Sequence, residues 1–187
     1  RIERDGGALH ARSWAFMRGL VAGRGWYRVN TKYDEDADPN GPGGWDQEII
    51  FQRILHQESV YIDPSAIEPD FSDAKWALVI GWMSKADFKK EFPDSRAAKM
   101  GSEFAGWELI AQQAPDWVKA KADDHDEEGV LVAEYWHRDI ERQEIVDPVD
   151  PERKRTREIP HVTCYKINGF EVLETQKWDG HWIPLVP

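Results

Sequence analysis

The sequence has few of the features that would place it outside a reducing compartment or in a membrane. Its 187 residues include one cysteine, Cys164, which excludes any disulfide within the chain and fits a reducing compartment. No apolar run reaches the roughly 18 residues that a membrane-spanning helix needs. We therefore expect neither a disulfide-stapled domain nor a membrane span, and we expect no secretory signal peptide.

Basic residues are also scarce. The chain has 24 Lys and Arg against 35 Asp and Glu, a net charge of −11. Such a surface repels phosphate, which disfavours tight nucleic-acid binding by the whole molecule but suits a surface past which nucleic acid must slide. The one basic cluster is "RKRTR", and it contributes the candidate contact residues Arg153, Lys154, Arg155 and Arg157. They either contact phosphate or an acidic neighbour, or form a solvated loop tip.

Tryptophan, in contrast, is abundant. Ten tryptophans and a 41% hydrophobic content indicate a globular chain with one core, together with large contact surfaces beyond it. The chain begins with Arg1 and ends with the apolar run "WIPLVP". We therefore expect residues 1–187 to be a single fragment of a larger protein.

The hydrophobic pattern predicts an α+β fold, with a largely antiparallel β-sheet, an N-terminal helix and a few short helices. We divide the chain by sequence into four regions: a leading helix and cap (1–25), a first β region with an acidic turn (26–83), short helices (84–124) and a C-terminal β-hairpin region (129–187). Within the third region, Ser84 is expected to cap a helix over "SKADFKKEF", and two more helices are expected in "EFAGWELIAQQ" and "PDWVKAKADD".

Two local patterns give sharper predictions. One helical stripe is predicted near the N-terminus, from the spacing of Leu9, Ser13, Phe16 and Leu20 and, beside them, Trp14, Met17 and Val21. The glycines of "GLVAGRG" predict a left-handed cap at the end of this helix. Asn168-Gly169 lies between two β-rich runs, which predicts a two-residue type I′ hairpin. That register would pair Ile167 with Phe170, Lys166 with Glu171 and Cys164 with Leu173, so Cys164 is interpreted as strand packing and not as a nucleophile.

Two acidic clusters raise the question of metal binding. "DEDADPNG" begins like a calcium loop, but Pro39 and Trp45 occupy the positions that require glycine and a bidentate glutamate. Asp63, Glu68, Asp70 and Asp73 could gather around a cation if their loop folded back. The alternative is that Asp63-Pro64 and Glu68-Pro69 end a strand, and that Asp and Ser close local turns before the strand expected in "KWALVIGWM". We favour this structural turn.

No established catalytic motif is present. The six histidines lack the spacing of a zinc site, and nucleotide-binding glycine motifs are absent. Asp116, Glu152 and Lys154 together match a short P-D…E-x-K nuclease pattern, but the E-x-K is expected on the tip of an extended loop, "DPVDPERKRT", where its geometry would not be fixed. We therefore expect no enzyme activity, no catalytic or metal-binding residues, and no cofactor.

Three blocks of sequence carry a family resemblance. They are "DQEIIFQRI…SVYIDPSAIEPDFSDAKWALVIGWMSKADFKKEFPD", "VLVAEYWHRD" and "VTCYKINGFEVLETQKWDGHWIPLVP". In order and spacing they resemble the portal protein of short-tailed, podovirus-type tailed phages, from about Gly19 onward. The resemblance implies part of the outer, wing-like region of the subunit, without the stem helices and the clip.

The resemblance also implies a role and partners. Portal subunits form a ring, typically of twelve copies, at one capsid vertex in the virion, after assembly in the host cytoplasm. The ring conducts DNA without sequence-specific binding and serves as the platform for terminase and tail proteins, with scaffold and capsid proteins as further partners and no membrane. Surplus acid fits a DNA conduit, and indole anchors fit wide subunit faces. Two alternatives stay open at this point: the metal-dependent nuclease and a tryptophan-rich carbohydrate-binding module.

Overall fold

A computed structural model describes residues 6–33, 41, 45–100, 129–146 and 152–187. The chain divides into two compact units: unit 1 comprises Arg1–Ala74 with Trp182–Pro187, and unit 2 comprises Lys75–His181. Both combine helix with antiparallel strands, which confirms the predicted α+β class. The calcium-like loop and the two helices expected between residues 103 and 124 lie outside the described residues.

Unit 1 is a small sheet with one helix. Its strands β1 (Tyr27–Tyr33), β2 (Gln47–Arg53) and β8 (Leu185–Val186) are ordered β2-β1-β8 and are antiparallel. Helix α2 (Ala8–Ala22) precedes them, and η1 (Gln57–Ser59) and β3 (Val60–Ile62) follow. Gly23 adopts a left-handed φ of 80° and donates its N–H to the Gly19 carbonyl, which confirms the predicted glycine cap.

Helix α2 packs through its small residues. Ala8, Ala11 and Ala15 are buried, and the latter two form a cluster with Tyr27. A Cβ on Gly25 would lie 1.7 Å from the Ala15 carbonyl oxygen, so the backbones approach too closely for larger side chains. The large members of the predicted stripe are instead exposed, by 60–81% (Leu9, Phe16, Met17, Leu20 and Val21). The apolar stripe predicted the helix correctly but does not form its packing face.

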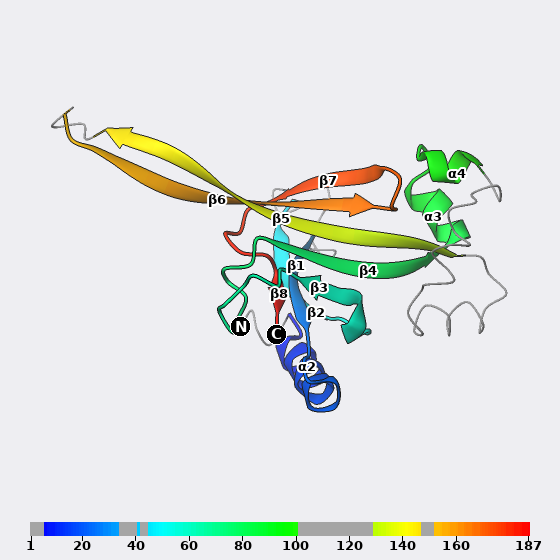
Figure 1. Ribbon diagram of the computed structural model, residues 1–187. Helices are drawn as coiled ribbons and strands as arrows, with labels where there is room; N and C mark the ends of the chain where they lie inside the picture. The colour runs from blue at the N-terminus through cyan, green and yellow to red at the C-terminus, as the bar shows by residue number, and fades with distance from the viewer. Residues whose placement is uncertain (1–5, 34–40, 42–44, 101–128, 147–151) are drawn as a thin grey trace. The chain divides into compact units, whose positions relative to one another are not determined.

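Unit 2 contains strands β4 (Trp76–Ser84), β5 (Gly129–Val146), β6 (Lys154–Ile167) and β7 (Val172–Trp178), hydrogen-bonded in that order and all antiparallel (Figure 1). Two short helices, α3 (Lys85–Glu91) and α4 (Arg96–Met100), lie between β4 and β5 in the sequence. The Ser84 side chain accepts from the Asp87 N–H, as predicted for this cap. Phe88 of α3 packs against Val130 and Val132 of β5.

The hairpin between β6 and β7 has a different register from the predicted one. Ile167 pairs with Val172, Lys166 with Glu174 and Cys164 with Gln176, with an irregularity after Lys166. A type I′ turn needs positive φ at both central residues, but only Gly169 has it, at 84°. Four residues therefore form the connection.

Tertiary contacts explain this longer turn. The Asn168 side-chain oxygen accepts from the backbone N–H groups of Phe170 and Glu171, at 3.1 and 3.0 Å. The Glu171 carboxylate in turn accepts from the N–H groups of Arg96 and Ala97 at the start of α4, at 2.8 and 3.3 Å. Strand pairing of Glu171 with Lys166 is thus exchanged for capping a helix, an outcome that the turn dipeptide alone could not predict.

Strands β5 and β6 are longer than the sequence suggested. The sequence pattern predicts a first strand over "GVLVAEYWHRD", ending at Asp139, and a loop tip in "DPVDPERKRT". Instead β5 continues to Val146 and β6 already begins at Lys154, so their ladder runs from Ala133↔Ile167 to Val146↔Lys154. The cross-strand ion pairs described below favour this extension of the ladder.

Candidate interaction surface

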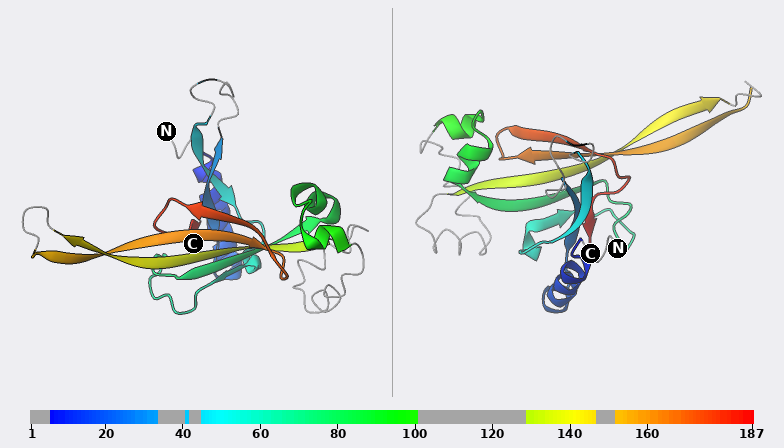
Figure 2. Two further views of the ribbon diagram at one scale, coloured as in Figure 1. Left: turned by 90° about the horizontal axis from the view of Figure 1, so that it is seen from above. Right: turned by 180° about the vertical axis from the view of Figure 1, so that it is seen from behind.

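The outer part of the β5–β6 hairpin is a two-stranded ribbon, here called the arm (Asp139–Val146 with Lys154–His161). The β4 ladder ends at Trp76↔His137 and the β7 ladder at Val162↔Trp178, so neither strand accompanies the arm. Figures 1 and 2 show the two strands extending past β4 and β7 as a twisted pair. Eight residue pairs at about 3.3 Å per residue give the arm a length of about 25 Å.

The arm is exposed on both faces. Residues 139–144 of β5 and 154–158 of β6 are all exposed. Pro160, which cannot donate to a ladder, stands where β6 has no β7 neighbour, a position that tolerates proline. Isolated two-stranded ribbons are marginally stable in water, so the arm relies on cross-strand contacts of its own or on a partner.

One face of the arm carries balanced charge. Arg142 and Glu158 lie opposite each other in the register and their side chains are 3.1 Å apart. Lys154 reaches diagonally to Glu144, at 2.8 Å. Because side chains alternate along a strand, Arg142, Glu144, Lys154 and Glu158 share this face, called the paired face. Two cations and two carboxylates neutralise each other there.

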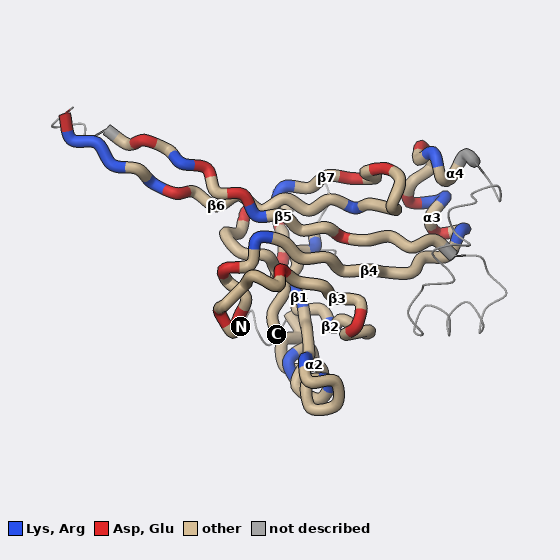
Figure 3. Tube along the Cα trace, viewed as in Figure 1, with Lys and Arg blue, Asp and Glu red and all other residues tan. Residues whose placement is uncertain are grey.

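The opposite face carries unbalanced positive charge near the tip. Arg155 pairs in register with Ile145, and Arg157 with Gln143, so the residues directly opposite them carry no charge. Glu141 lies on the same face, diagonal to Arg157, and contacts His161 at 3.1 Å. Arg153, two residues before Arg155, extends the row. Figure 3 shows these basic residues along β6 of the arm. Within the described part of the chain, the three guanidinium groups contact no carboxylate. We call Arg153, Arg155 and Arg157 the arginine row.

The predicted basic cluster is therefore divided between two environments. Lys154 belongs to the paired face and binds Glu144, whereas none of the three arginines contacts a carboxylate among the residues that the structure describes. Sequence reasoning found the cluster but not this division. The signal was present in the alternation of "RDIERQEIV" and "KRTREIPH", which becomes informative once both segments are strands.

The residues of the nuclease pattern are not brought together as a site by the described structure. Glu152 lies in the turn before β6, and Lys154 is bound to Glu144 at the exposed start of that strand. Asp116 lies outside the described residues. Among the described residues no group of three or more His, Cys, Asp or Glu side chains is arranged to hold a metal ion.

The acidic turn between β3 and β4 is held by its own hydrogen bonds. The Asp63 carboxylate accepts from the Ser65 N–H and hydroxyl, at 2.9 and 2.6 Å. The Asp73 carboxylate accepts from the N–H groups of Ile67 and Glu68, at 2.7 and 3.3 Å. These contacts confirm the prediction that the carboxylates close a structural turn.

The rest of the turn presents charge to solvent. The backbone N–H and the hydroxyl of Ser72 hydrogen-bond to Asp70 and hold the pKa of that carboxyl below its usual value. Glu68 and Asp70 are both exposed. Phe71 has a φ of 56°, and its ring packs on Trp26 with 5.3 Å between centroids, so the turn is anchored to the core of unit 1.

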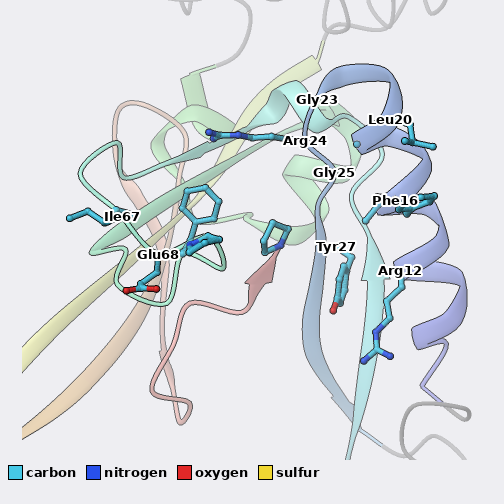
Figure 4. A pocket seen from close by; sticks show the side chains of 15 residues that line it. Arg12, Phe16, Leu20, Gly23, Arg24, Gly25, Tyr27, Ile67 and Glu68 are labelled. Atoms are coloured by element: carbon cyan, nitrogen blue, oxygen red, sulfur yellow. The ribbon is translucent and has the colours of Figure 1, made fainter.

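An open groove of about 740 Å³ lies beside this turn within unit 1. Figure 4 shows Phe16 and Leu20 of α2 on one side and Ile67 and Glu68 of the turn on the other. Its lining is mostly apolar, with charges at Arg12, Arg24 and Glu68. The arrangement suits an apolar segment and offers no set of nucleophile, acid and base among the lining residues.

The remaining sequence candidates are structural. Cys164 is buried in β6, in register with Trp136 of β5, as expected for strand packing. Lys166 is held by Glu174 at 2.8 Å and by Glu91 at 3.4 Å. Burial alone would lower the pKa of Lys166, but the hydrogen bond and charge of Glu174, together with Glu91, outweigh it and raise the pKa. No helix in the described ranges has the length and apolarity to cross a membrane.

Comparison with known proteins gives these surfaces a context. A family model described as phage P22-like portal protein matches residues 1–187. The chain belongs to this portal family. Its members are structural proteins of the phage capsid, so the structural role expected from the sequence is supported and the nuclease and carbohydrate-binding alternatives are not.

A curated relative agrees with the family. A protein named "Portal protein" from Acyrthosiphon pisum secondary endosymbiont phage 1 is 28% identical over 178 residues, which is 95% of this chain and 21% of that protein. The chain thus spans about a fifth of the length of this portal relative. The resemblance drawn from the three sequence blocks is confirmed at the level of the family.

Proposed function

We propose that this chain is one segment of a portal subunit and contributes to the outer, wing-like region of a ring at the capsid vertex. The observation that carries the proposal is the match of the portal family along all 187 residues. The relative's much greater length supports a larger subunit in which stem and clip segments accompany this one.

The ring would conduct the genome during packaging and ejection and would offer a platform to the terminase motor and the tail proteins. Its place would be the virion, after assembly in the host cytoplasm alongside scaffold and capsid proteins. Two physical observations support this role. The net charge of −11 limits adhesion of DNA to the wall of a conduit. Helix α2 exposes five large apolar side chains, which suits a surface that is covered in an assembly.

The contacts of the ring would be heterologous. In a closed ring each subunit meets its two neighbours through different patches. We propose that the basic residues of the arm, Arg153, Lys154, Arg155 and Arg157, lie in or beside such a contact. This supports a structural part for the arm without catalysis or a cofactor.

The test is assembly of the complete protein that contains this segment. Light scattering and negative-stain electron microscopy are expected to give one discrete ring of identical subunits. A complete protein that stays monomeric at high concentration would contradict the proposal. A nicking assay with Mg²⁺ or Mn²⁺ tests the enzyme alternative, and cleavage that is lost in Glu152→Gln and Lys154→Ala variants would favour a nuclease.

A further inference from the structure

The arginine row concentrates positive charge on a small surface, which suits binding to an acidic partner. Four of the 24 basic residues lie within residues 153–157, which contain no acidic residue, while the rest of the chain has 20 basic and 35 acidic residues. The row thus projects positive charge from a strongly negative molecule. Arg155 and Arg157 occupy alternate positions of β6, about 7 Å apart along the strand, and Arg153 directly precedes it. All three guanidinium groups are planar donors that can bind a carboxylate through two hydrogen bonds.

Nucleic acid is the less suitable partner. A duplex would meet the three arginines together with the field of a chain whose net charge is −11, and the paired face offers it two carboxylates, those of Glu144 and Glu158. Repulsion by the remaining acidic residues weakens such binding at every position of the duplex. A second copy of this chain also has a net charge of −11, but charges more than about 8 Å apart are largely screened at physiological salt, so the charges of the two contacting patches dominate.

The acidic turn of unit 1 supplies a matching surface. Glu68 and Asp70 are exposed, and no basic side chain of the described residues forms an ion pair with either of them. Arg24, which lines the same groove as Glu68, lies over the Phe71 ring at 5.4 Å. Hydrogen bonds from Ser72 lower the pKa of Asp70, which favours the charged form of this carboxylate. The turn is also fixed by its internal hydrogen bonds, so little conformational entropy would be lost on binding.

We propose that Arg153, Arg155 and Arg157 of one copy dock against Glu68 and Asp70 on the acidic turn of a second copy. This inference rests on the proposed ring and names one of its contacts. The arm and the turn are different patches of one chain, so each copy can give its arm to one neighbour and receive an arm from the other. That is the heterologous geometry that closes a ring. Docking also gives an otherwise marginal ribbon the partner that it lacks.

Reciprocal charge reversal in the complete protein tests the contact. In the arm variant, Arg155→Glu and Arg157→Glu place acid against the acidic turn. In the turn variant, Glu68→Lys and Asp70→Lys place base against the arginine row. Each variant alone is expected to associate at least tenfold more weakly than the wild-type protein in sedimentation velocity. An equimolar mixture restores association, because both interfaces again join opposite charges.

A matched control uses the other face of the same arm. Arg142→Glu with Glu158→Arg exchanges the two charges of one ion pair on the paired face and leaves Lys154 and the arginine row intact, so association is expected to stay within about threefold of wild type. Circular dichroism checks that all variants are folded, and recovery in the mixture shows independently that both interface variants are competent.

The outcomes separate this inference from the proposed function. Normal rings of the arm variant, or a mixture that does not recover, overturn the docking contact and leave the ring intact. Failure of the wild-type protein to form rings overturns both. The last outcome concerns DNA, probed with a duplex of 20 base pairs, about two helical turns. If the arm variant assembles normally but no longer binds this duplex, the row binds nucleic acid and the proposed contact is wrong.

Discussion

The β5–β6 hairpin has two parts: an inner half, which lies between β4 and β7, and the arm. The two parts share one hydrogen-bonded ladder but differ in the burial of their side chains. In the inner half, β5 and β6 lie between β4 and β7. Four of their side chains are buried there: Val130, Val132, Val162 and Cys164. In the arm the same two strands continue their register beyond the ends of the β4 and β7 ladders, and residues 139–144 and 154–158 are exposed. The hydrogen-bonded ladder is common to both, so the difference lies in burial. The inner half stabilises the fold, whereas we propose that the arm contacts another subunit.

Removing a core side chain from the inner half should have the largest effect. Phe88 is 1% exposed and packs on Val130 and Val132. Phe88→Ala is expected to lower the free energy of unfolding by about 3–5 kcal/mol, because it removes buried contacts and leaves a cavity. Urea denaturation followed by tryptophan fluorescence measures the loss.

The arm provides the matched control for that experiment. Ile140, on the same strand β5 as Val130, is 54% exposed, and Ile140→Ala is expected to change stability by no more than about 0.5 kcal/mol. Losses of similar size at Phe88 and Ile140 would show that the arm is as integral to the fold as the inner half, and the comparison would fail.

A smaller effect is expected at the unusual turn between β6 and β7. Glu171→Ala removes the acceptor for the Arg96 and Ala97 N–H groups and should cost about 1 kcal/mol, as loss of a helix cap does. Glu171→Gln keeps an acceptor oxygen and should cost less. Amide hydrogen exchange at Arg96 and Ala97 reports the local opening. Unchanged protection in Glu171→Ala would mean that the carboxylate does not cap α4.

The contribution of the Lys166 ion pairs to the stability of the inner half should depend on pH. Its pKa is raised in the folded state by Glu174 and Glu91, so the stabilisation is complete below the unfolded-state lysine pKa of about 10.4 and is lost as pH rises through the folded-state pKa. The stability difference between wild type and Lys166→Met should therefore shrink in strongly alkaline solution. Arg142→Met in the arm is the control, because a guanidinium stays charged there. A difference that is independent of pH would contradict the assigned ion pairs.

The sequence predicted the elements better than it predicted their contacts. The strands, the Ser84 cap and the glycine cap of α2 follow from local chemistry, and they are present. The packing face of α2 was assigned to its large apolar residues because periodicity does not report how closely Gly25 approaches Ala15. The predicted register at Asn168-Gly169 was wrong because it rested on local sequence alone. The Glu171 carboxylate instead accepts from the start of α4, 75 residues away in the sequence.

The candidate surface was predictable only in part. Composition identified the basic cluster, and the polar, proline-flanked stretch "DPVDPERKRT" favoured a loop over a strand. The sequence alone does not show which arginines lack a carboxylate partner, because this depends on the face of the strand and on the register of β5 with β6. Strands β4 and β7 pair with these two strands at the other end of the hairpin. The identity of the family came from the order of three sequence blocks and from no single residue.

The smallest expected effect is also the most direct measure of what holds the arm. Arg142 and Glu158 are 75% and 55% exposed, so solvent screens their attraction. A double-mutant cycle with Arg142→Ala and Glu158→Ala should give a coupling of about 0.2–0.5 kcal/mol that declines in molar salt. Ladder bonds and weak pairs of this size cannot by themselves keep the 16 residues of the arm ordered against their conformational entropy. A coupling above about 2 kcal/mol would mean that the arm holds itself, and the physical reason for a docking partner would be removed.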